Sequence, residues 1–261
     1  MLLENKNAFI TGGSSGIGQA ITIAFARAGA NVAFTYNQNN AGAASTLNIL
    51  KGNPTKASAI QANLIDISII PELINKVEAN LGSIDILVNN AGAVIRSPHF
   101  LDTPLEALDE VISLNLKVPF FLMQTVANRM KNRKTKGNIL NISSVSAEIV
   151  SPGLAHYECS KAALNALTRA AASELAAFNI RVNAIAPGLV ATNMNQEQRE
   201  HNPDAWNLRK NKIPLGRAGE PNDIASMALF LASEQAEWIT GNIITIDGGL
   251  SVSSPFQRNP A

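Results

Sequence analysis

Short runs of apolar and β-branched residues alternate along this chain with longer stretches in which apolar residues recur at helical spacing. The short runs predict seven strands, at 8–11, 31–36, 57–61, 84–88, 138–142, 181–186 and 243–246. The longer stretches predict helices at 16–28, 41–51, 71–80, 103–131, 155–177 and 221–232. Because strands and helices alternate, we expect an α/β fold with a doubly wound parallel sheet of about seven strands and helices on both faces.

The whole chain, residues 1–261, is expected to form a single domain, because no linker, internal repeat or low-complexity segment divides it. The least regular stretch, 193–212, is polar and compatible with helix. Its position between two well-patterned elements predicts a mobile flap over the substrate. In such a sheet, ligands bind beyond the carboxyl ends of the strands, where the strand order reverses.

Composition excludes several classes of protein. The 261 residues are 46% hydrophobic and 16% charged, which is typical of a globular protein rather than a disordered one. With 21 basic and 20 acidic residues the net charge is +1, which gives no reason to expect nucleic acid or an anionic membrane as a partner. Histidine, cysteine and acidic residues do not share metal-ligand spacing, so no metal site is expected.

The N-terminal residues lack a signal-peptide pattern, and no apolar run approaches the ~20 residues of a membrane span, so we expect a cytoplasmic protein. Cys159 is the one cysteine, and a disulfide within the chain is therefore excluded. Helical geometry directs Cys159 away from Tyr157 and Lys161, and we interpret it as a packing residue.

A glycine-rich turn joins the first predicted strand to the first predicted helix. Glycine lets the backbone approach a pyrophosphate closely, and a helix N-terminus offers free N–H groups and partial positive charge. A purely structural turn could have the same composition, but the position at the first strand–helix junction favours nucleotide binding. The expected cofactor contacts in this turn are Gly12, Ser14, Ser15, Gly16, Ile17 and Gly18.

Further motifs follow the later strands in a fixed order. They are Asn89-Asn90-Ala91-Gly92, Asn115, Ser144, Tyr157-x-x-x-Lys161, Pro187-Gly188 and Thr192. Together with the Gly-x₃-Gly-x-Gly spacing of the turn, this set resembles the short-chain dehydrogenase/reductase family over essentially the whole chain. The resemblance implies a Rossmann-type fold, and within the family the chain is similar to bacterial glucose 1-dehydrogenases and 3-oxoacyl carrier-protein reductases.

The residues themselves indicate acid–base chemistry. A free tyrosine has a pKa of ~10, and a nearby ammonium favours its phenolate. Tyr157 and Lys161 are four residues apart on a predicted helix and share a face, while Ser144 at a strand end can hold the substrate oxygen. Singly, the three could be an interface aromatic, a solvated charge and a turn residue. The resemblance selects Ser144 over Ser143, and implies that Lys161 binds the nicotinamide ribose and that Asn115 holds a water linking the lysine to solvent.

The end of the second predicted strand carries Tyr36 and Asn37, with no acid to repel a 2′-phosphate. No arginine stands at Ser15 to grip a 2′-phosphate either, but Asn37 and Ser15 could donate hydrogen bonds to it. Because no acid repels the phosphate, we expect NADP as cofactor, with NAD possible. Asn63 and Leu64 are expected to flank the adenine. The remaining cofactor contacts implied by the resemblance are Asn89, Ala91, Gly92, Tyr157, Lys161, Pro187, Gly188 and Thr192.

Three segments are expected to wall the substrate: 93–101, 145–156 and the flap 193–212. The candidate substrate contacts are Ser144, Tyr157, Val94, Glu148 and Leu154. Glu148 and His156 could bind a polyol or could be solvated loop residues. His156-Tyr157, the Met194-containing flap and the tail Ser254-Pro255-Phe256-Gln257 rank the glucose dehydrogenases slightly first.

We therefore predict an NADP-preferring oxidoreductase that moves a hydride between nicotinamide and a small carbonyl or alcohol, glucose 1-dehydrogenase-like or a ketoreductase. Alternatives are a 3-oxoacyl carrier-protein reductase, a non-catalytic dinucleotide sensor, and an isomerase or dehydratase on the same scaffold. The resemblance and the alanine-rich helix at 155–177 also imply a homotetramer. The basic run at 129–136 is interpreted as a solvated helix end, with docking of an acidic carrier protein as the other hypothesis.

Overall fold

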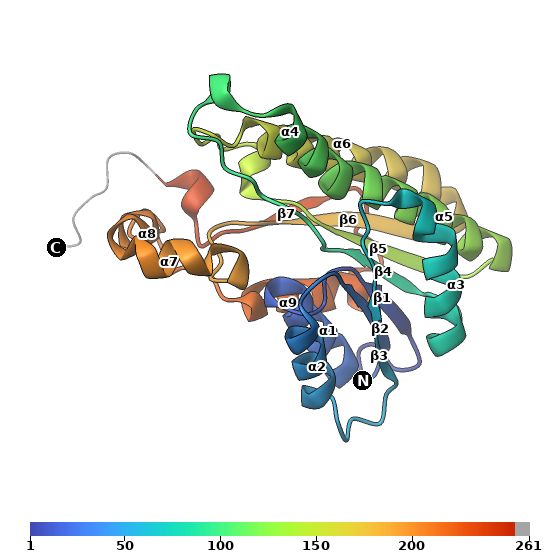
Figure 1. Ribbon diagram of the computed structural model, residues 1–261. Helices are drawn as coiled ribbons and strands as arrows, with labels where there is room; N and C mark the ends of the chain where they lie inside the picture. The colour runs from blue at the N-terminus through green and yellow to red at the C-terminus, as the bar shows by residue number, and fades with distance from the viewer. Residues whose placement is uncertain (254–261) are drawn as a thin grey trace.

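Seven parallel strands form one sheet in the order β3-β2-β1-β4-β5-β6-β7 (Figure 1). The structure is a computed structural model and describes residues 1–253, so the tail at 254–257 lies outside the described residues. The strands are β1 (Asn7–Ile10), β2 (Asn31–Tyr36), β3 (Ala57–Gln61), β4 (Ile86–Asn89), β5 (Gly137–Ile142), β6 (Ile180–Pro187) and β7 (Ile243–Ile246). The predicted doubly wound α/β fold is confirmed, with every strand within two residues of its expected start.

Helices cover both faces of the sheet, and two further helices stand apart beside one end of it (Figure 1). They are α1 (Gly16–Arg27), α2 (Asn40–Ile49), α3 (Ile70–Leu81), α4 (Leu105–Ile112), α5 (Val118–Arg133), α6 (Ala155–Leu175), α7 (Gln196–His201), α8 (Pro203–Lys210) and α9 (Pro221–Ala232). The helices beside the sheet, α7 and α8, lie in the predicted flap, whose mobility stays a prediction.

The prediction of one continuous helix at 103–131 is wrong. The region 103–131 is not a single continuous α-helix, because a π-helical turn at Ser113–Lys117 separates α4 from α5. Pro104 precedes α4 with extended backbone, and the expected start at 103 falls in the connection. Apolar periodicity does not distinguish i→i+4 from i→i+5 hydrogen bonding over one turn, which is why the sequence did not reveal it.

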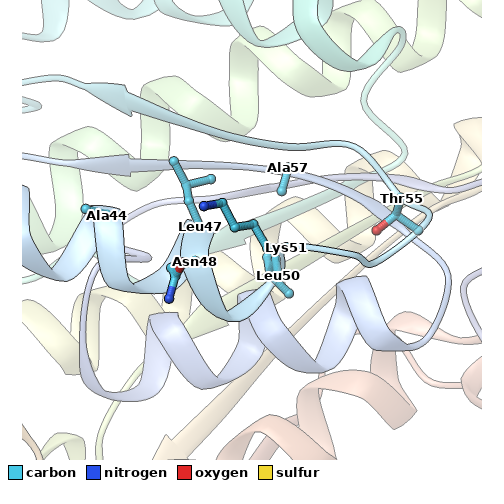
Figure 2. A pocket seen from close by; sticks show the side chains of 7 residues that line it. All are labelled: Ala44, Leu47, Asn48, Leu50, Lys51, Thr55 and Ala57. Atoms are coloured by element: carbon cyan, nitrogen blue, oxygen red, sulfur yellow. The ribbon is translucent and has the colours of Figure 1, made fainter.

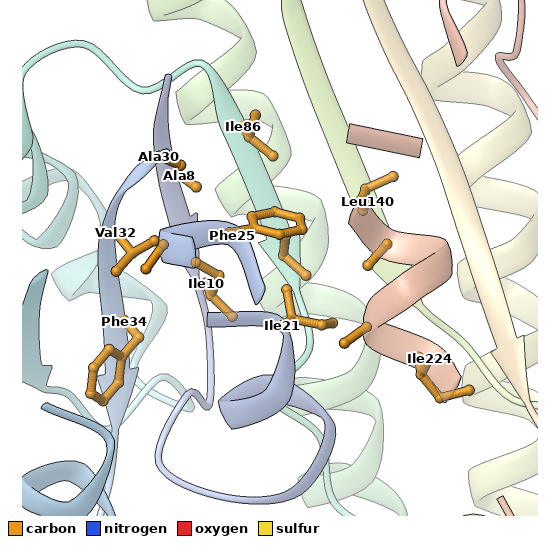
Figure 3. Close-up of a cluster of buried hydrophobic side chains, with 14 of the residues drawn as sticks. Ala8, Ile10, Ile21, Phe25, Ala30, Val32, Phe34, Ile86, Leu140 and Ile224 are labelled. Carbon is orange, nitrogen blue, oxygen red and sulfur yellow. The ribbon is translucent and has the colours of Figure 1, made fainter. Parts of the chain in front are cut away.

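Successive side chains of each strand point to opposite faces of the sheet, so the hydrophobic core has two layers. On one face Ile10 of β1 and Leu140 of β5 pack with Ile21 and Phe25 of α1 and with Ile224 of α9 (Figure 3). On the other face the intervening strand residues pack against α3, α5 and α6. Because both faces are buried, the strands are nearly continuous in apolar character rather than alternating with polar residues.

The strand order reverses at β1, which pairs with β2 on one side and with β4 on the other. Ile10 lies opposite Val88 in the register, so Thr11, directly after β1, lies next to Asn89, the last residue of β4. This is the place at which a sheet of this kind binds its ligand.

In residues 1–253, no helix has both the length and the apolar character needed to cross a bilayer. Over the same residues, no group of three or more His, Cys, Asp or Glu side chains is arranged to hold a metal ion.

Candidate active site

The turn between β1 and α1 is shaped by glycine. Gly12 and Gly16 have positive φ angles of 71° and 54°, a region that side chains disfavour. A Cβ on Gly18 would collide with the backbone of Gly12, so the helix packs directly on the turn. Ser15 begins α1 without a side-chain capping bond, and no acidic residue lies in the first turn. The N–H groups at this end of α1 therefore remain available to an anion.

Two residues that the sequence interpretation missed hold this turn in place. Thr11 Oγ1 accepts hydrogen bonds from the backbone N–H groups of Asn90 and Ala91, both at 2.9 Å. The Asn90 side chain donates to the carbonyl oxygens of Thr11 at 2.8 Å and Gly12 at 3.1 Å. A polar residue ending the first strand opposite an Asn-Asn pair was the signal that could have found them.

Of the predicted cofactor residues at the end of β4, one lies beneath the site and two lie in the turn that borders it. Asn89 is buried, and its amide donates to Asn141 Oδ1 at 2.8 Å, beneath the site. Ala91 and Gly92 lie in the turn itself, and a Cβ on Gly92 would be 3.0 Å from Asn115 Oδ1 and 3.7 Å from Lys161 Nζ. Because Gly92 has no Cβ, Lys161 Nζ and Asn115 Oδ1 can both lie close to it.

Ser144, Tyr157 and Lys161 meet between β5 and α6. Ser144 follows β5 and hydrogen-bonds the Tyr157 side chain. Lys161 lies one turn further along α6, and its Nζ is 5.8 Å from the centroid of the Tyr157 ring. The same Nζ donates to the carbonyl oxygen of Ile142 at 2.9 Å. Burial lowers the pKa of Lys161 to about 8.

The expected lowering of the Tyr157 pKa is wrong for this structure. Burial raises the pKa of Tyr157, and the hydrogen bond from Ser144 offsets only part of that effect. The phenol is therefore protonated near neutral pH and is poised to donate a proton.

Ser143 lies next to Ser144 but is turned into the helix. Its Oγ donates to Asn165 Oδ1 at 2.6 Å and lies 3.4 Å from the Lys161 carbonyl oxygen. This leaves Ser144 as the serine that reaches Tyr157, in agreement with the motif spacing.

Asn115 projects from the π-helical turn and is 1% exposed. Its amide accepts from the N–H of Ala93 at 2.9 Å and donates to the Ala93 carbonyl at 3.0 Å and to Ser160 Oγ at 3.0 Å. Ser160 in turn donates to the Tyr157 carbonyl at 2.6 Å. The π turn thus connects the loop after β4 to the helix that carries Tyr157 and Lys161, and single π turns are frequent at functional sites.

The adenosine end of the expected cofactor site lies at the ends of β2 and β3. Tyr36 ends β2, and Gln61 of β3 donates to the carbonyl oxygen of Asn37 at 2.8 Å. Asn63 is exposed and its side chain accepts from Ile65 N–H at 3.4 Å, whereas Leu64 is buried.

Two of the three expected substrate walls are joined to each other. Ser97 N–H donates to the Gly153 carbonyl at 3.1 Å, and His156 Nε2 is 2.7 Å from the carbonyl oxygen of Ile95. His156 is buried at 4% exposure, so its interpretation as a solvated loop residue is wrong. The remaining candidate substrate contacts in these two walls differ in exposure: Val94 is partly buried, Leu154 is buried and Glu148 is exposed.

Cys159 is exposed, which corrects its interpretation as a packing residue. It lies on α6 between Tyr157 and Lys161 in sequence, on a face that residues 1–253 leave exposed. The helical argument placed it away from Tyr157 but could not tell whether another element covers it.

A short segment connects β6 to the flap. Pro187 is buried in β6, Gly188 packs against Asp247, and Thr192 starts a short helical segment with a capping box to Asn195. Further along, burial and the positive charge of Arg96 lower the pKa of Arg209. Helix α8 of the flap therefore faces the loop after β4, which brings the third wall to the other two.

The basic run at 129–136 makes contacts within the subunit. Arg129 and Arg133 both form ion pairs with Glu78 of α3. Lys136 pairs with Glu237 at 2.9 Å, and Lys131 lies over the Phe178 ring. These contacts favour the interpretation of a helix end that the fold itself neutralises.

A groove of about 520 Å³ lies between α2 and the start of β3 (Figure 2). Ala57, at its edge, begins β3, whereas the catalytic candidates follow the carboxyl ends of other strands. The groove is therefore separate from the candidate site, which lies at the opposite end of the strands.

Comparison with known proteins decides the family. The profile of a family described as Enoyl-(Acyl carrier protein) reductase matches residues 12–251. A 3-oxoacyl-(acyl-carrier-protein) reductase FabG of Thermotoga maritima is 40% identical over 253 residues, covering 97% of this chain and 100% of that protein. The chain belongs to the short-chain dehydrogenase/reductase family.

Other members of the short-chain dehydrogenase/reductase family are nearly as similar. Glucose 1-dehydrogenase 2 of Bacillus subtilis is 36% identical over 252 residues and covers 96% of each chain. The structure of a putative short-chain alcohol dehydrogenase from Sinorhizobium meliloti 1021 aligns with a TM-score of 0.91 at 37% identity, covering 97% of this chain and 98% of that one. A putative NAD(P) dependent gluconate 5-dehydrogenase from Beutenbergia cavernae, with bound NADP, aligns at 0.87 and 32% identity, covering 96% and 98%.

Proposed function

We propose that this short-chain dehydrogenase/reductase reduces a carbonyl on a small substrate with NADPH, and oxidises the corresponding alcohol in reverse. The observation that carries the proposal is the junction of Ser144, Tyr157 and Lys161 with Asn115, next to the glycine turn. No observation favours a sensor without chemistry, because a sensor has no use for a buried lysine and a protonated phenol at one point.

The residues fit a dinucleotide. The uncapped N-terminus of α1 and the positive-φ glycines Gly12 and Gly16 suit a diphosphate. When bound, the dinucleotide supplies the hydride that adds to the carbonyl carbon. The chain's own residues then handle the carbonyl oxygen and its proton.

Ser144 and Tyr157 hold the carbonyl oxygen between two hydroxyl groups. Tyr157 donates its phenolic proton to the oxygen as the alcohol forms. The Lys161 ammonium stabilises the resulting phenolate. The attraction between the two charges is stronger than in water because Lys161 is buried. Asn115 and Ser160 keep the backbone beneath Tyr157 in position.

NADP is proposed as the preferred cofactor because no acid stands at Tyr36, Asn37 or the two residues after them. Asn37 is exposed and can donate to a 2′-phosphate. NAD remains the alternative, and the ratio of kcat/KM for NADPH and NADH measures the preference.

The walls favour an acyl thioester over a sugar as substrate. Arg96 and Arg209 place two cations where the loop after β4 meets the flap, which suits a phosphate on a carrier arm. Val150 in the second wall is 78% exposed and apolar. Glu148 is exposed, in agreement with its interpretation as a solvated loop residue rather than a polyol contact. Aldose oxidation, which the sequence ranked slightly first, is the second candidate.

Absorbance at 340 nm tests both candidates. Purified protein is offered NADPH or NADH with acetoacetyl thioesters and simple ketones, and NADP or NAD with glucose and other aldoses. We expect turnover of the thioester with NADPH. Turnover of aldoses alone would refute the thioester proposal, and dinucleotide binding without turnover of any carbonyl or alcohol would favour the sensor.

A homotetramer is proposed as the assembly. Three small residues on α6, Ala162, Ala166 and Ala170, are exposed at successive turns, which permits close approach of a second helix. Phe120 and Phe121 of α5 are also exposed, at 44% and 37%. Size-exclusion with light scattering measures the mass, and a single monomer peak would refute the tetramer.

A further inference from the structure

A cavity of about 330 Å³ lies behind the glycine turn. It is bounded by the outer face of α1, by the start of the flap and by the N-terminus of α9. Gly16 and Thr192 belong to its lining, and both also border the turn where a diphosphate is expected. One charged side chain of the flap, Arg199 on α7, reaches the same cavity.

Among the residues that the structure describes, Arg199 has a donor, Nε, that makes no hydrogen bond. Its Nη2 donates to the Thr192 carbonyl oxygen at 3.2 Å, and its guanidinium carbon is 5.8 Å from the Trp206 ring centroid. The Nε atom is buried. Within residues 1–253, no carboxylate forms an ion pair with it, although Glu220 lines the same cavity. A partly buried guanidinium without an anion costs free energy that a bound anion would recover.

The opposite side of Thr192 offers a second set of unused donors. Thr192 sits so close to the turn that a Cβ on Gly16 would be 3.3 Å from the Thr192 Cβ. Beneath it, the N-terminus of α1 has neither a side-chain cap at Ser15 nor an acid in its first turn. Helix N–H groups and a flap cation therefore flank the same residue.

We propose that Arg199 is a further binding residue for the diphosphate of the dinucleotide, delivered by the flap. This inference rests on the proposed function, because it assumes that a dinucleotide binds at the glycine turn. The guanidinium fork suits phosphate oxygens, and its hydrogen bond to the Thr192 carbonyl holds it beside the residue that also contacts the turn. Closure of α7 over the site thereby depends on the negative charge that the ligand carries.

The test measures ligand binding by Arg199→Gln, with Arg27→Gln as the matched control. Arg27 is exposed at the other end of α1, so its loss removes the same charge far from the turn. The two tryptophans are Trp206, in the flap, and Trp238, which is fully exposed. In a Trp238→Phe background, Trp206 fluorescence reports ligand binding and flap position without any turnover.

We expect Arg199→Gln to weaken binding of NADPH and of ADP-ribose about tenfold to hundredfold, the usual range for a lost hydrogen bond to a charged group. Adenosine, which has no phosphate, should bind the variant and the unaltered protein equally in competition with ADP-ribose. Arg199→Lys should recover part of the loss because it restores the charge but not the fork. Arg27→Gln should bind all three ligands normally.

Undiminished binding of ADP-ribose by Arg199→Gln would overturn the inference and leave the proposed function standing. An equal loss for adenosine would also overturn it, because the residue would then act only by supporting the flap. If the unaltered protein bound neither NADPH nor NADH, the proposed function and this inference would both fail.

Discussion

The two faces of the sheet are built differently. On the face covered by α1 and α9, the central strands contribute apolar side chains such as Ile10, Ile86 and Leu140 (Figure 3). On the face covered by α5 and α6, β4 and β5 instead contribute Asn89 and Asn141 near their carboxyl ends. The first face holds its helices by apolar burial, which has no preferred direction.

The second face holds α6 by directed hydrogen bonds. Asn89 donates to Asn141 at 2.8 Å, Asn141 donates to Thr168 Oγ1 at 2.9 Å, and Thr168 donates to the Leu164 carbonyl at 2.8 Å. This row of buried polar groups fixes how α6 is turned relative to the sheet. Both faces have an apolar core, but since Tyr157 and Lys161 lie on α6, the directed hydrogen bonds are added on the face that carries the chemistry.

Polar side chains on the first face serve a different purpose. Asn138 and Arg181, near the amino ends of β5 and β6, donate to the carbonyl oxygen of Leu231 at 2.7 Å each. They satisfy the C-terminal end of α9 and do not connect with the catalytic side chains.

The largest expected effect is the loss of turnover in Tyr157→Phe. Removal of the proton donor should lower kcat by about 10²- to 10⁴-fold, the usual contribution of a general acid. Binding of NADPH should change little, and Trp fluorescence titration provides that control. Substantial remaining activity would show that another group supplies the proton.

On the apolar face, Phe25→Ala should reduce the free energy of unfolding by about 3–5 kcal/mol, because Phe25 is fully buried and leaves a cavity. Turnover per folded molecule should stay within about twofold, since no hydrogen bond links Phe25 to α6. Urea unfolding together with kcat measured at low temperature separates the two effects. A large fall in kcat would contradict the division between the faces.

On the polar face, Asn141→Leu should destabilise by about 1–3 kcal/mol, because Asn89 and Thr168 lose their partner in a dry environment. Here kcat should fall as well, since α6 loses a fixed orientation. The double variant Asn141→Leu/Thr168→Val removes two of the three groups and should recover part of the stability. Equal kcat for Asn141→Leu and the unaltered protein would argue against a positioning role for the row.

The smallest expected effect is a change with pH. Carbonyl reduction needs Tyr157 and Lys161 both protonated. Burial lowers the pKa of Lys161 to about 8 and raises the pKa of Tyr157, so the pair loses its first proton near pH 8. The kcat/KM for reduction should fall about tenfold per unit above that value, which is ~1.4 kcal/mol per unit. Alcohol oxidation uses the pair with one proton fewer and should rise toward the same midpoint. Profiles that move together in both directions would contradict this assignment.

Much of this could be predicted from the sequence because it depends on local pattern. Strand positions follow from runs of apolar residues, and the identity of Ser144 followed from its spacing to Tyr157. The direction of the Tyr157 pKa could not be predicted, because it is set by the balance between burial and the nearby hydroxyl. The same holds for His156 and Cys159, whose burial and exposure depend on which distant segments cover α6.

The roles of Asn90, Thr11 and Arg199 were also missed. Each makes a contact across a large sequence separation or depends on a flap conformation that local periodicity does not specify. The flap showed helix-compatible residues, but the two helices α7 and α8 and the orientation of Arg199 follow only from the packing of that segment against Thr192 and Trp206.

Because the turn at Ser113–Lys117 is π-helical, the number of residues in it determines where Asn115 points. One residue fewer would restore an ordinary α-helical ladder and rotate α4 by ~100° relative to α5. Asn115 would then leave Ala93 and Ser160, although every catalytic side chain would still be encoded. A single-codon deletion between 113 and 117 should therefore be as damaging as the replacement of Asn115 itself, whereas the same deletion in the connection before α4 should be tolerated.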